Sequence, residues 1–338
     1  MRVSAGIYLA LALAAGSSFA SDPKNPSKHP ALPVLGVKTP GVRIPFADLK
    51  TELEWKPAAT PAWIAMADSI LIPSKDGLSR VDPKAKESKF GEPIGGLKEP
   101  CGGLVNAFSN LWVPNCGEGT LVRLDSKTGK AIAKIATGAG NARIGIAATA
   151  DSVWMLTDAR GTLSRIDPVQ NVVVAELRVY ADCNSLLFGE TALWLTCPTE
   201  NVVLRVDPAT NLVDKSIEVA AAPTALVAGE SSIWVLCGKE GKVDRIDPKT
   251  NKVTKSIELG SPAGGGAMAF GEGSLWVSMP GFPVTRIDPQ GEKVVQQFYG
   301  EGGGFLLTTP NSLWLAETAE GSWCASTRAA LPPRWRSN

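Results

Sequence analysis

The sequence predicts an all-β fold, a seven-bladed β-propeller of four-stranded antiparallel blades in which the seventh blade is incomplete. Three observations predict it: a recurring apolar pair that ends in Trp, an Arg-x-Asp corner that follows every such pair except the last, and short β-prone runs between them. The pairs are Leu111-Trp112, Val153-Trp154, Leu193-Trp194, Ile233-Trp234, Leu275-Trp276 and Leu313-Trp314. The corners are Arg80–Pro83, Arg123–Asp125, Arg165–Pro168, Arg205–Pro208, Arg245–Pro248 and Arg286–Pro289. A period of roughly 40–45 residues built from short strands is typical of propeller blades.

The N-terminus has the pattern of a secretory signal peptide over residues 1–20. Arg2 precedes the apolar run Ala5–Gly16, and Ser18–Ala20 supplies the small residues that a signal peptidase needs. Because the apolar run is short for a membrane span, we expect cleavage near Ala20 and a periplasmic or secreted protein without stable membrane insertion. An uncleaved membrane anchor is the alternative. Residues 21–42, rich in Pro and Lys, are expected to form a flexible leader.

Residues 43–330 are expected to form the propeller, and residues 331–338 a disordered tail. When the first copy is aligned on Ile70-Leu71, which lacks the Trp, seven copies fit between about Thr60 and the C-terminus. Seven blades close a ring without free sheet edges, so we expect one domain.

One copy shows the strands expected in each blade. Ala225–Ala228 is a short inner run, Ser232–Leu236 is rich in β-branched and aromatic residues, and Lys242–Ile246 alternates polar and apolar residues. Asp247–Asn251 is a turn, because its Asp can accept a backbone N–H and its Pro presets φ. Lys252–Leu259 carries several lysines, as exposed outer strands often do.

Two known families have blades like this one. Asp247–Val253 followed by Ile257–Gly260 resembles the YVTN-type repeat of YncE-like bacterial propellers, and the blades are also similar to those of the streptogramin (virginiamycin B) lyase family. The resemblance covers roughly Gly41–Gly321 and implies the propeller fold. The lyase resemblance also implies a histidine base, a metal and a glutamate at the mouth of the central channel. The single histidine, His29, lies in the leader, which places the lyase activity in doubt.

Composition limits the expected partners. A net charge of +1 gives no electrostatic reason to expect nucleic acid or an acidic membrane surface. The sequence has no phosphate-binding glycine loop, no serine nucleophile elbow and no aromatic-basic stripe for single-stranded nucleic acid. We therefore expect a monomeric binding or scaffold module for an unidentified small ligand or periplasmic protein, with no resident cofactor or metal.

The repeated Trp, Arg and Asp residues are expected to build the blades. A Trp that recurs once per blade is best explained as core between adjacent blades, with its N–H bonded to a neighbouring group. The Arg-x-Asp spacing places both side chains on one face of the third strand. That pair either links a blade to its neighbour or braces its own turn.

The cysteines predict two disulfides. Cys101 and Cys183 precede the Trp of their blades, whereas Cys116 and Cys197 follow it, so each pair should face across a hairpin. Cys101–Cys116 and Cys183–Cys197 are thus expected to form in an exported protein. Cys237 faces Pro223 or Thr224 rather than a cysteine, and we expect it to be a small buried side chain rather than a nucleophile.

The default site is the face where inner strands begin and second strands end, around the mouth of the channel. Its candidate ligand-binding residues are Glu99, Asn106, Arg143, Tyr180, Asp182 and Asn184. These residues could equally be ordinary solvated loop residues. The alternative function is a metal-assisted lyase or lactonase, in which Glu99, Asn106, Asp182 and Asn184 surround a divalent cation. We identify no catalytic residue from the sequence.

The last copy departs from the repeat after Gly321. Residues 323–328 read Trp-Cys-Ala-Ser-Thr-Arg, which the codons TGG TGC GCC TCG ACC CGC would encode. Starting two bases later, that string encodes Val-Arg-Leu-Asp-Pro, the missing motif, so we expect a frameshift here, caused either by a mutation or by a sequencing error. We expect Thr51–Trp55 to be the outer strand of this blade, Ser322–Arg328 to be a poor third strand, and Cys324 to be a free exposed thiol.

Overall fold

A computed structural model provides the structure of this chain. It describes residues 35–55, 62–74, 77–82, 94–138, 145–158, 160–317 and 326–330. The predicted signal peptide, residues 21–34 of the leader, Arg143, Cys324 and residues 331–338 lie outside this part of the chain. Leu35–Asn338 form one compact unit. Within the described ranges, no helix is long and apolar enough to cross a membrane.

The described strands form seven sheets, here numbered in chain order. Sheet 1 contains β3 (Ala65–Met66), β4 (Ile70–Ser74), β5 (Gly77–Val81) and β6 (Ile94–Gly95). Sheet 2 contains β7 (Val105–Ala107), β8 (Asn110–Asn115), β9 (Thr120–Asp125) and β10 (Ala131–Ala136). Sheet 3 contains β11 (Ile146–Ala148), β12 (Val153–Asp158), β13 (Thr162–Asp167) and β14 (Val172–Arg178). Sheet 4 contains β15 (Ser185–Gly189), β16 (Ala192–Cys197), β17 (Val202–Asp207) and β18 (Leu212–Glu218).

The remaining sheets follow the same plan. Sheet 5 contains β19 (Pro223–Gly229), β20 (Ser232–Cys237), β21 (Lys242–Asp247) and β22 (Lys252–Glu258). Sheet 6 contains β23 (Ala267–Gly271), β24 (Ser274–Met279), β25 (Phe282–Asp288), β26 (Lys293–Tyr299) and, parallel to β26, β1 (Arg43–Pro45). Sheet 7 contains β27 (Gly304–Thr309), β28 (Ser312–Glu317), β29 (Ser326–Ala330) and β2 (Thr51–Trp55). The described ranges also contain three short 3-10 helices, which are η1 (Phe46–Asp48), η2 (Cys116–Glu118) and η3 (Gly238–Glu240).

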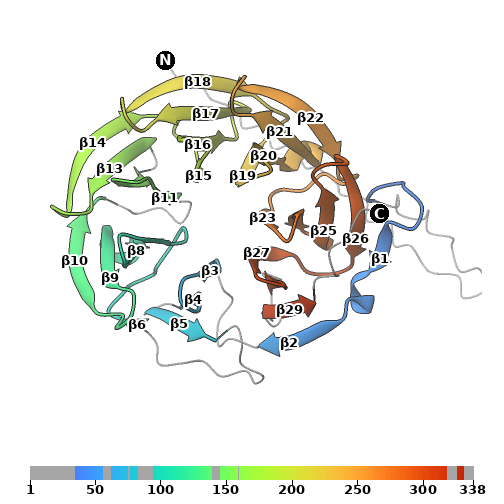
Figure 1. Cartoon of the computed structure of the whole chain (residues 1–338), viewed down its shortest axis with the longest axis horizontal. Coiled ribbons are helices and arrows are strands. Elements are labelled where there is room, and N and C mark those ends of the chain that lie inside the picture. The colour runs from blue at the N-terminus through green and yellow to red at the C-terminus, as the bar shows by residue number, and fades with distance from the viewer. Residues whose placement is uncertain are drawn as a thin grey trace, which may run out of the picture. The chain divides into compact units, whose positions relative to one another are not determined.

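These sheets make the fold an all-β propeller with four-stranded antiparallel blades, as the repeat predicts (Figure 1). In sheets 3 to 5 the first strand lies toward the middle of the ribbon drawing and the fourth strand forms the rim. The expected propeller class is therefore confirmed.

The Trp of each copy lies opposite the Arg of the same copy on the next strand. This register holds for Trp112 and Arg123, and the pairs in sheets 3 to 6 repeat it. In these five sheets the guanidinium carbon lies between 5.1 and 5.8 Å from the indole centroid, a distance at which cation and ring attract each other. The Trp194 N–H donates to the Gly189 carbonyl of its own hairpin at 2.9 Å. The indole is thus buried with its polar group satisfied, as expected for a Trp of the core.

The core lies between adjacent sheets rather than inside any one of them. One cluster joins Trp154 and Leu163 of sheet 3 to Leu193 and Leu204 of sheet 4. Similar clusters join the other neighbours, including sheet 7 to sheet 1, where Trp314 packs with residues of β4 and β5. Each blade therefore buries its apolar faces against the blades on either side.

The two explanations left open for the Arg-x-Asp pair both hold, one for each residue. Arg123 of sheet 2 donates to the Pro168 carbonyl at 2.6 Å and to Asn171 Oδ1 at 3.1 Å, both in the turn of sheet 3. Asp125 accepts the N–H groups of residues 127 and 128 in its own turn. These backbone hydrogen bonds hold the pKa of Asp125 below its ordinary value. In this copy the Arg joins two blades, and the Asp braces the turn of one.

Sheet 7 is completed by the N-terminal strand, as predicted. β2 pairs antiparallel with β29, which in turn pairs with β28. Arg328 stands opposite Trp314, the register that Arg and Trp keep in the other sheets, although the surrounding sequence departs from the repeat. Ser326–Ala330 thus fills the third-strand position that we expected this segment to fill poorly.

Some residues before residue 43, the predicted start of the propeller, contact the blades. The Gly36 N–H donates to the Gly260 carbonyl at 2.9 Å, and the Val37 N–H donates to Gln297 Oε1 at 2.8 Å. Gln297 is fully buried, and its amide nitrogen donates to the Leu259 carbonyl at 2.9 Å. The last residues assigned to the flexible leader are therefore bound along sheets 5 and 6.

Candidate functional site

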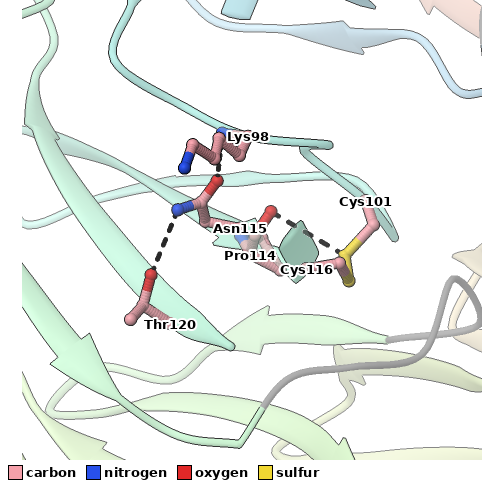
Figure 2. Close-up of a disulfide and its surroundings, with 6 residues drawn as sticks. All are labelled: Lys98, Cys101, Pro114, Asn115, Cys116 and Thr120. Atoms are coloured by element: carbon pink, nitrogen blue, oxygen red, sulfur yellow. Dashed lines mark hydrogen bonds between the residues drawn. A yellow bond between two sulfur atoms is a disulfide. The ribbon is translucent and has the colours of Figure 1, made fainter. Parts of the chain in front are cut away.

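The candidate site is the mouth face, defined here as the face formed by the segments before the inner strands and after the second strands. In sheet 2 the Cys101–Cys116 disulfide joins these two segments, with 5.9 Å between the Cα atoms. The Cys101 N–H also donates to the Pro114 carbonyl at 3.1 Å. This predicted disulfide is confirmed, and it fixes the start of β7 against the end of β8 (Figure 2).

Asn115, which precedes Cys116, connects the segments around this disulfide by hydrogen bonds. Its Oδ1 accepts the Lys98 N–H at 2.5 Å, and its Nδ2 donates to Glu118 Oε2 at 3.0 Å and to Thr120 Oγ1 at 3.2 Å, two of these contacts being visible in Figure 2. Asn115 is fully buried, so its amide is part of the framework. A hydrogen bond from Lys134 lowers the pKa of Glu118 from its ordinary value.

Sheet 4 joins the same two segments by three consecutive residues. Asp182 accepts the Thr199 N–H, Cys183 forms the predicted disulfide with Cys197, and Asn184 Oδ1 accepts the Thr196 hydroxyl at 2.9 Å. The candidate residues Asp182 and Asn184 therefore flank the second confirmed disulfide, and their hydrogen bonds join the start of β15 to the end of β16.

Sheet 5 has no cross-link at this position. Pro223 stands opposite Cys237, which is a free and fully buried thiol, as expected. Burial raises the pKa of the Cys237 thiol, and the nearby Asp244 carboxylate raises it further. A buried, neutral thiol is a weak nucleophile, so Cys237 acts as a small core side chain.

The loop before β19 is held by side chains instead. The N–H groups of Ala220, Ala221 and Ala222 donate in turn to Asp244 Oδ2 at 2.7 Å, to Glu240 Oε1 at 2.7 Å and to Asn201 Oδ1 at 2.9 Å. Asp244 is almost fully buried, and its other oxygen accepts the Ser256 hydroxyl at 2.5 Å. Three acceptors thus fix three successive residues of one loop.

A cavity of about 350 Å³ opens on the mouth face between sheets 5 and 6. Three loops contribute its lining residues, which are Ala222, Thr224, Gly238, Lys239, Pro262, Ala263 and Gly264. The Gly238 N–H donates to the Ala222 carbonyl at 3.0 Å, and the Gly238 carbonyl accepts the Ala263 N–H at 2.8 Å. Backbone hydrogen bonds therefore tie the three loops to one another around the cavity.

Sequence reasoning identified this face but not the cavity. The run Gly264–Gly266 is visible in the sequence, yet the two other loops lie about 25 and about 40 residues before it. A comparison of the copies could have pointed to the cavity, because Pro223 stands where sheets 2 and 4 have a disulfide-bonded cysteine.

The other candidate residues do not converge on one point. Glu99 and Asn106 are exposed residues of sheet 2, whereas Asp182 and Asn184 belong to sheet 4, and sheet 3 lies between these two sheets in Figure 1. Tyr180 is 44% exposed in the loop before β15. Arg143 lies outside the described residues.

The described residues do not fit the metal that the lyase resemblance implies. In the described ranges, no group of three or more His, Cys, Asp or Glu side chains is placed to hold a metal ion. His29, the single histidine of the chain, lies outside these ranges. We therefore derive no catalytic step through a metal.

Comparison with known proteins identifies the fold. The chain is similar in structure to a virginiamycin B lyase from Staphylococcus aureus, with a TM-score of 0.68, 15% identity, and coverage of 83% of this chain and 99% of the lyase. A streptogramin B lyase structure gives a TM-score of 0.67, 16% identity, and coverage of 82% and 97%. The extracellular domain of a candidate one-component system from B. thetaiotaomicron gives a TM-score of 0.64 and 18% identity, with coverage of 86% of this chain and 43% of that one.

At these identities the structural matches show a shared propeller fold, which unrelated functions use. No protein-family model matches the sequence. No curated protein matches it in sequence either.

Proposed function

We propose that this chain is an exported β-propeller that acts as a binding or scaffold module through its mouth face. The observation that carries the proposal is how firmly that face is held. Two disulfides, the buried Asn115 and the three side-chain acceptors around Ala220–Ala222 fix the segments that form it. A rigid scaffold that fixes its surface loops is the usual way in which a protein presents binding residues.

The disulfides also support export, because such bonds persist in oxidising compartments outside the cytoplasm. We infer that cleavage near Ala20 releases a monomer into the periplasm or the medium. We further propose that the ring has seven YVTN-like blades, since the cluster around Trp314 joins sheet 7 to sheet 1.

The test is a thermal-shift screen of the purified exported protein against sugars, lactones, peptides and divalent cations, each with and without EDTA. Hydrogen exchange then locates any hit. Protection of the mouth face, residues 96–103, 180–184 and 220–224, supports the proposal. Protection confined to the opposite turns, such as residues 167–171 and 247–251, contradicts it.

The same screen addresses the enzymatic alternative. Stabilisation by a divalent cation that EDTA reverses, and that Glu99→Gln or Asp182→Asn abolishes, would favour the metal-assisted lyase or lactonase. A cation effect that both variants retain would leave the binding function preferred.

A further inference from the structure

Two glycines beside the cavity have no role in the fold that requires glycine. A Cβ atom on Gly264 or Gly265 would meet nothing within 4 Å, and neither residue has a positive φ. Gly266 is different, because a Cβ there would lie 2.4 Å from the Ser278 carbonyl oxygen. Since the fold accepts side chains at the first two positions, their absence keeps the space over the cavity open. This open space is what a molecule packed against the backbone would need.

The cavity wall combines an apolar surface with one hydroxyl and one ammonium group. Pro262 and Ala263 supply carbon atoms, Thr224 supplies the hydroxyl, and the exposed Lys239 supplies the positive charge. A pocket of this kind, apolar with a few polar groups, is typical of small-molecule sites, and its volume lies at their lower end.

Among the described residues, Lys239 forms no ion pair within 4.0 Å with the carboxylate next to it in sequence, Glu240, although its charge contributes to the lowered pKa of that carboxylate. Glu240 accepts a hydrogen bond from Lys242 at 2.8 Å and another from the Ala221 N–H at 2.7 Å. These two contacts hold the pKa of Glu240 below its ordinary value. Among the described residues, no ion pair joins Lys239 to a carboxylate within 4.0 Å. An ammonium group in this situation is available to an anionic ligand.

The cavity is also formed before any ligand arrives. Ala222 has a φ of 56°, a left-handed conformation that is unfavourable for alanine, and the Asn201 side chain holds its N–H. Strained backbone that its surroundings fix is found preferentially at functional sites. A wall that is already fixed binds without the entropy cost of ordering a loop.

We propose that this cavity binds a small organic carboxylate, with the carboxylate at Lys239 and the apolar body against Pro262, Ala263 and the Gly264 backbone. The inference rests on the proposed function, since it names the ligand class and the place on the mouth face. A ligand of this cavity should therefore need both a negative charge and a compact apolar body in order to bind. A neutral amide of the same shape should bind more weakly.

The experiment compares acetate, butyrate, hexanoate and benzoate with the matching amides, using the purified exported protein at constant ionic strength. Saturation-transfer NMR titrations give the dissociation constants. We expect butyrate, hexanoate or benzoate to bind at least about tenfold more tightly than its amide, a difference of about 1.4 kcal/mol. Acetate, which lacks the apolar body, should bind most weakly of the four acids.

Two variants and one control locate the site. Lys239→Gln removes the charge and should raise the dissociation constant for the acid about tenfold or more, while leaving the amide unchanged. Gly264→Phe places a ring over the cavity and should abolish binding without lowering the thermal midpoint, because the fold leaves room there. Lys249→Gln is the control, since Lys249 is an exposed lysine of the same sheet in the turn at the opposite face.

The outcomes separate this inference from the proposed function. If no carboxylate binds, or if Lys239→Gln and Gly264→Phe leave binding intact, the carboxylate site is wrong. The proposed function then still stands if another probe protects the mouth face in hydrogen exchange. If every hit protects only the opposite turns, both are wrong.

Discussion

Replacing Arg165 by methionine tests whether the repeated Arg joins neighbouring blades. Its Nε donates to Ser152 Oγ at 2.7 Å within sheet 3, and its Nη1 donates to Asn211 Oδ1 at 3.0 Å and to the Pro208 carbonyl at 3.4 Å in sheet 4. Methionine keeps the apolar stem against the indole but loses these bonds. Hydrogen bonds of a charged group contribute about 1.5 to 3 kcal/mol each, and we count the two shorter ones at the lower end because the side chain is partly exposed.

The other contacts of Arg165 contribute less. Its ion pair with Asp151 is worth about 1 kcal/mol or less, because the Asp151 side chain is 65% exposed. The guanidinium lies 5.6 Å from the Trp154 ring, a contact worth about 0.5 to 1 kcal/mol. Arg165→Met should therefore lower the free energy of unfolding by roughly 3.5 to 5 kcal/mol.

Arg205→Met is the matched control. Arg205 occupies the same position over Trp194 at 5.8 Å, but its guanidinium pairs with Asp214 of its own sheet. Among the described residues its buried Nε has no hydrogen-bond partner, so the variant loses no hydrogen bond at that atom. We expect a loss of roughly 1 to 2 kcal/mol. Urea unfolding followed by far-UV circular dichroism measures both variants, and equal losses would refute the inter-blade role of this Arg.

Three further predictions follow from the same contacts. Replacing both cysteines of the Cys183–Cys197 disulfide by alanine should lower the free energy of unfolding by about 3 kcal/mol, as expected for a closed loop of about 15 residues; urea unfolding measures this, and no change would contradict it. Backbone hydrogen bonds lower the pKa of Asp247 in the folded state, so its stabilisation is complete above the unfolded pKa and is lost as pH falls through the folded value, below about pH 4. Asp247→Asn should flatten the acid side of the stability–pH curve, and an unchanged slope would count against the role of this turn. Gly260→Ala should cost about 2 kcal/mol, because its φ is +75° and a Cβ would lie 2.2 Å from the bound N-terminal segment, whereas Gly264→Ala should leave the thermal midpoint unchanged.

The repeat predicted most of the fold because blades are local structures. Each sheet is made from consecutive hairpins, so the spacing of Trp and Arg along the chain largely sets their register across strands. For the same reason the cysteines could be paired correctly, since Cys183 and Cys197 lie at the two ends of one hairpin. The blade count rested on the same periodicity.

Features that depend on distant segments could not be predicted in this way. The parallel addition of β1 to β26 joins residues about 250 apart and follows no repeat. The hydrogen bond from the Val37 N–H to Gln297 Oε1 could not be predicted either, because in the sequence Gln297 looks like any other polar residue of an outer strand. Arg328 keeps its register opposite Trp314 although the spacing to that Trp is longer than in the other copies. A pattern search that requires constant spacing cannot find such a pair.

The cavity lies at a position where sheet 5 differs from sheets 2 and 4. In sheets 2 and 4 a disulfide draws the start of the inner strand to the end of the second strand, whereas Pro223 in sheet 5 cannot make that bond. The loop before Pro223 is instead fixed by Asn201, Glu240 and Asp244, whose side chains accept hydrogen bonds from its N–H groups. The hairpin mouth therefore stays open without becoming flexible. A hairpin end that is fixed without a cross-link is what the proposed ligand site requires, because a preformed site binds without the cost of ordering a loop.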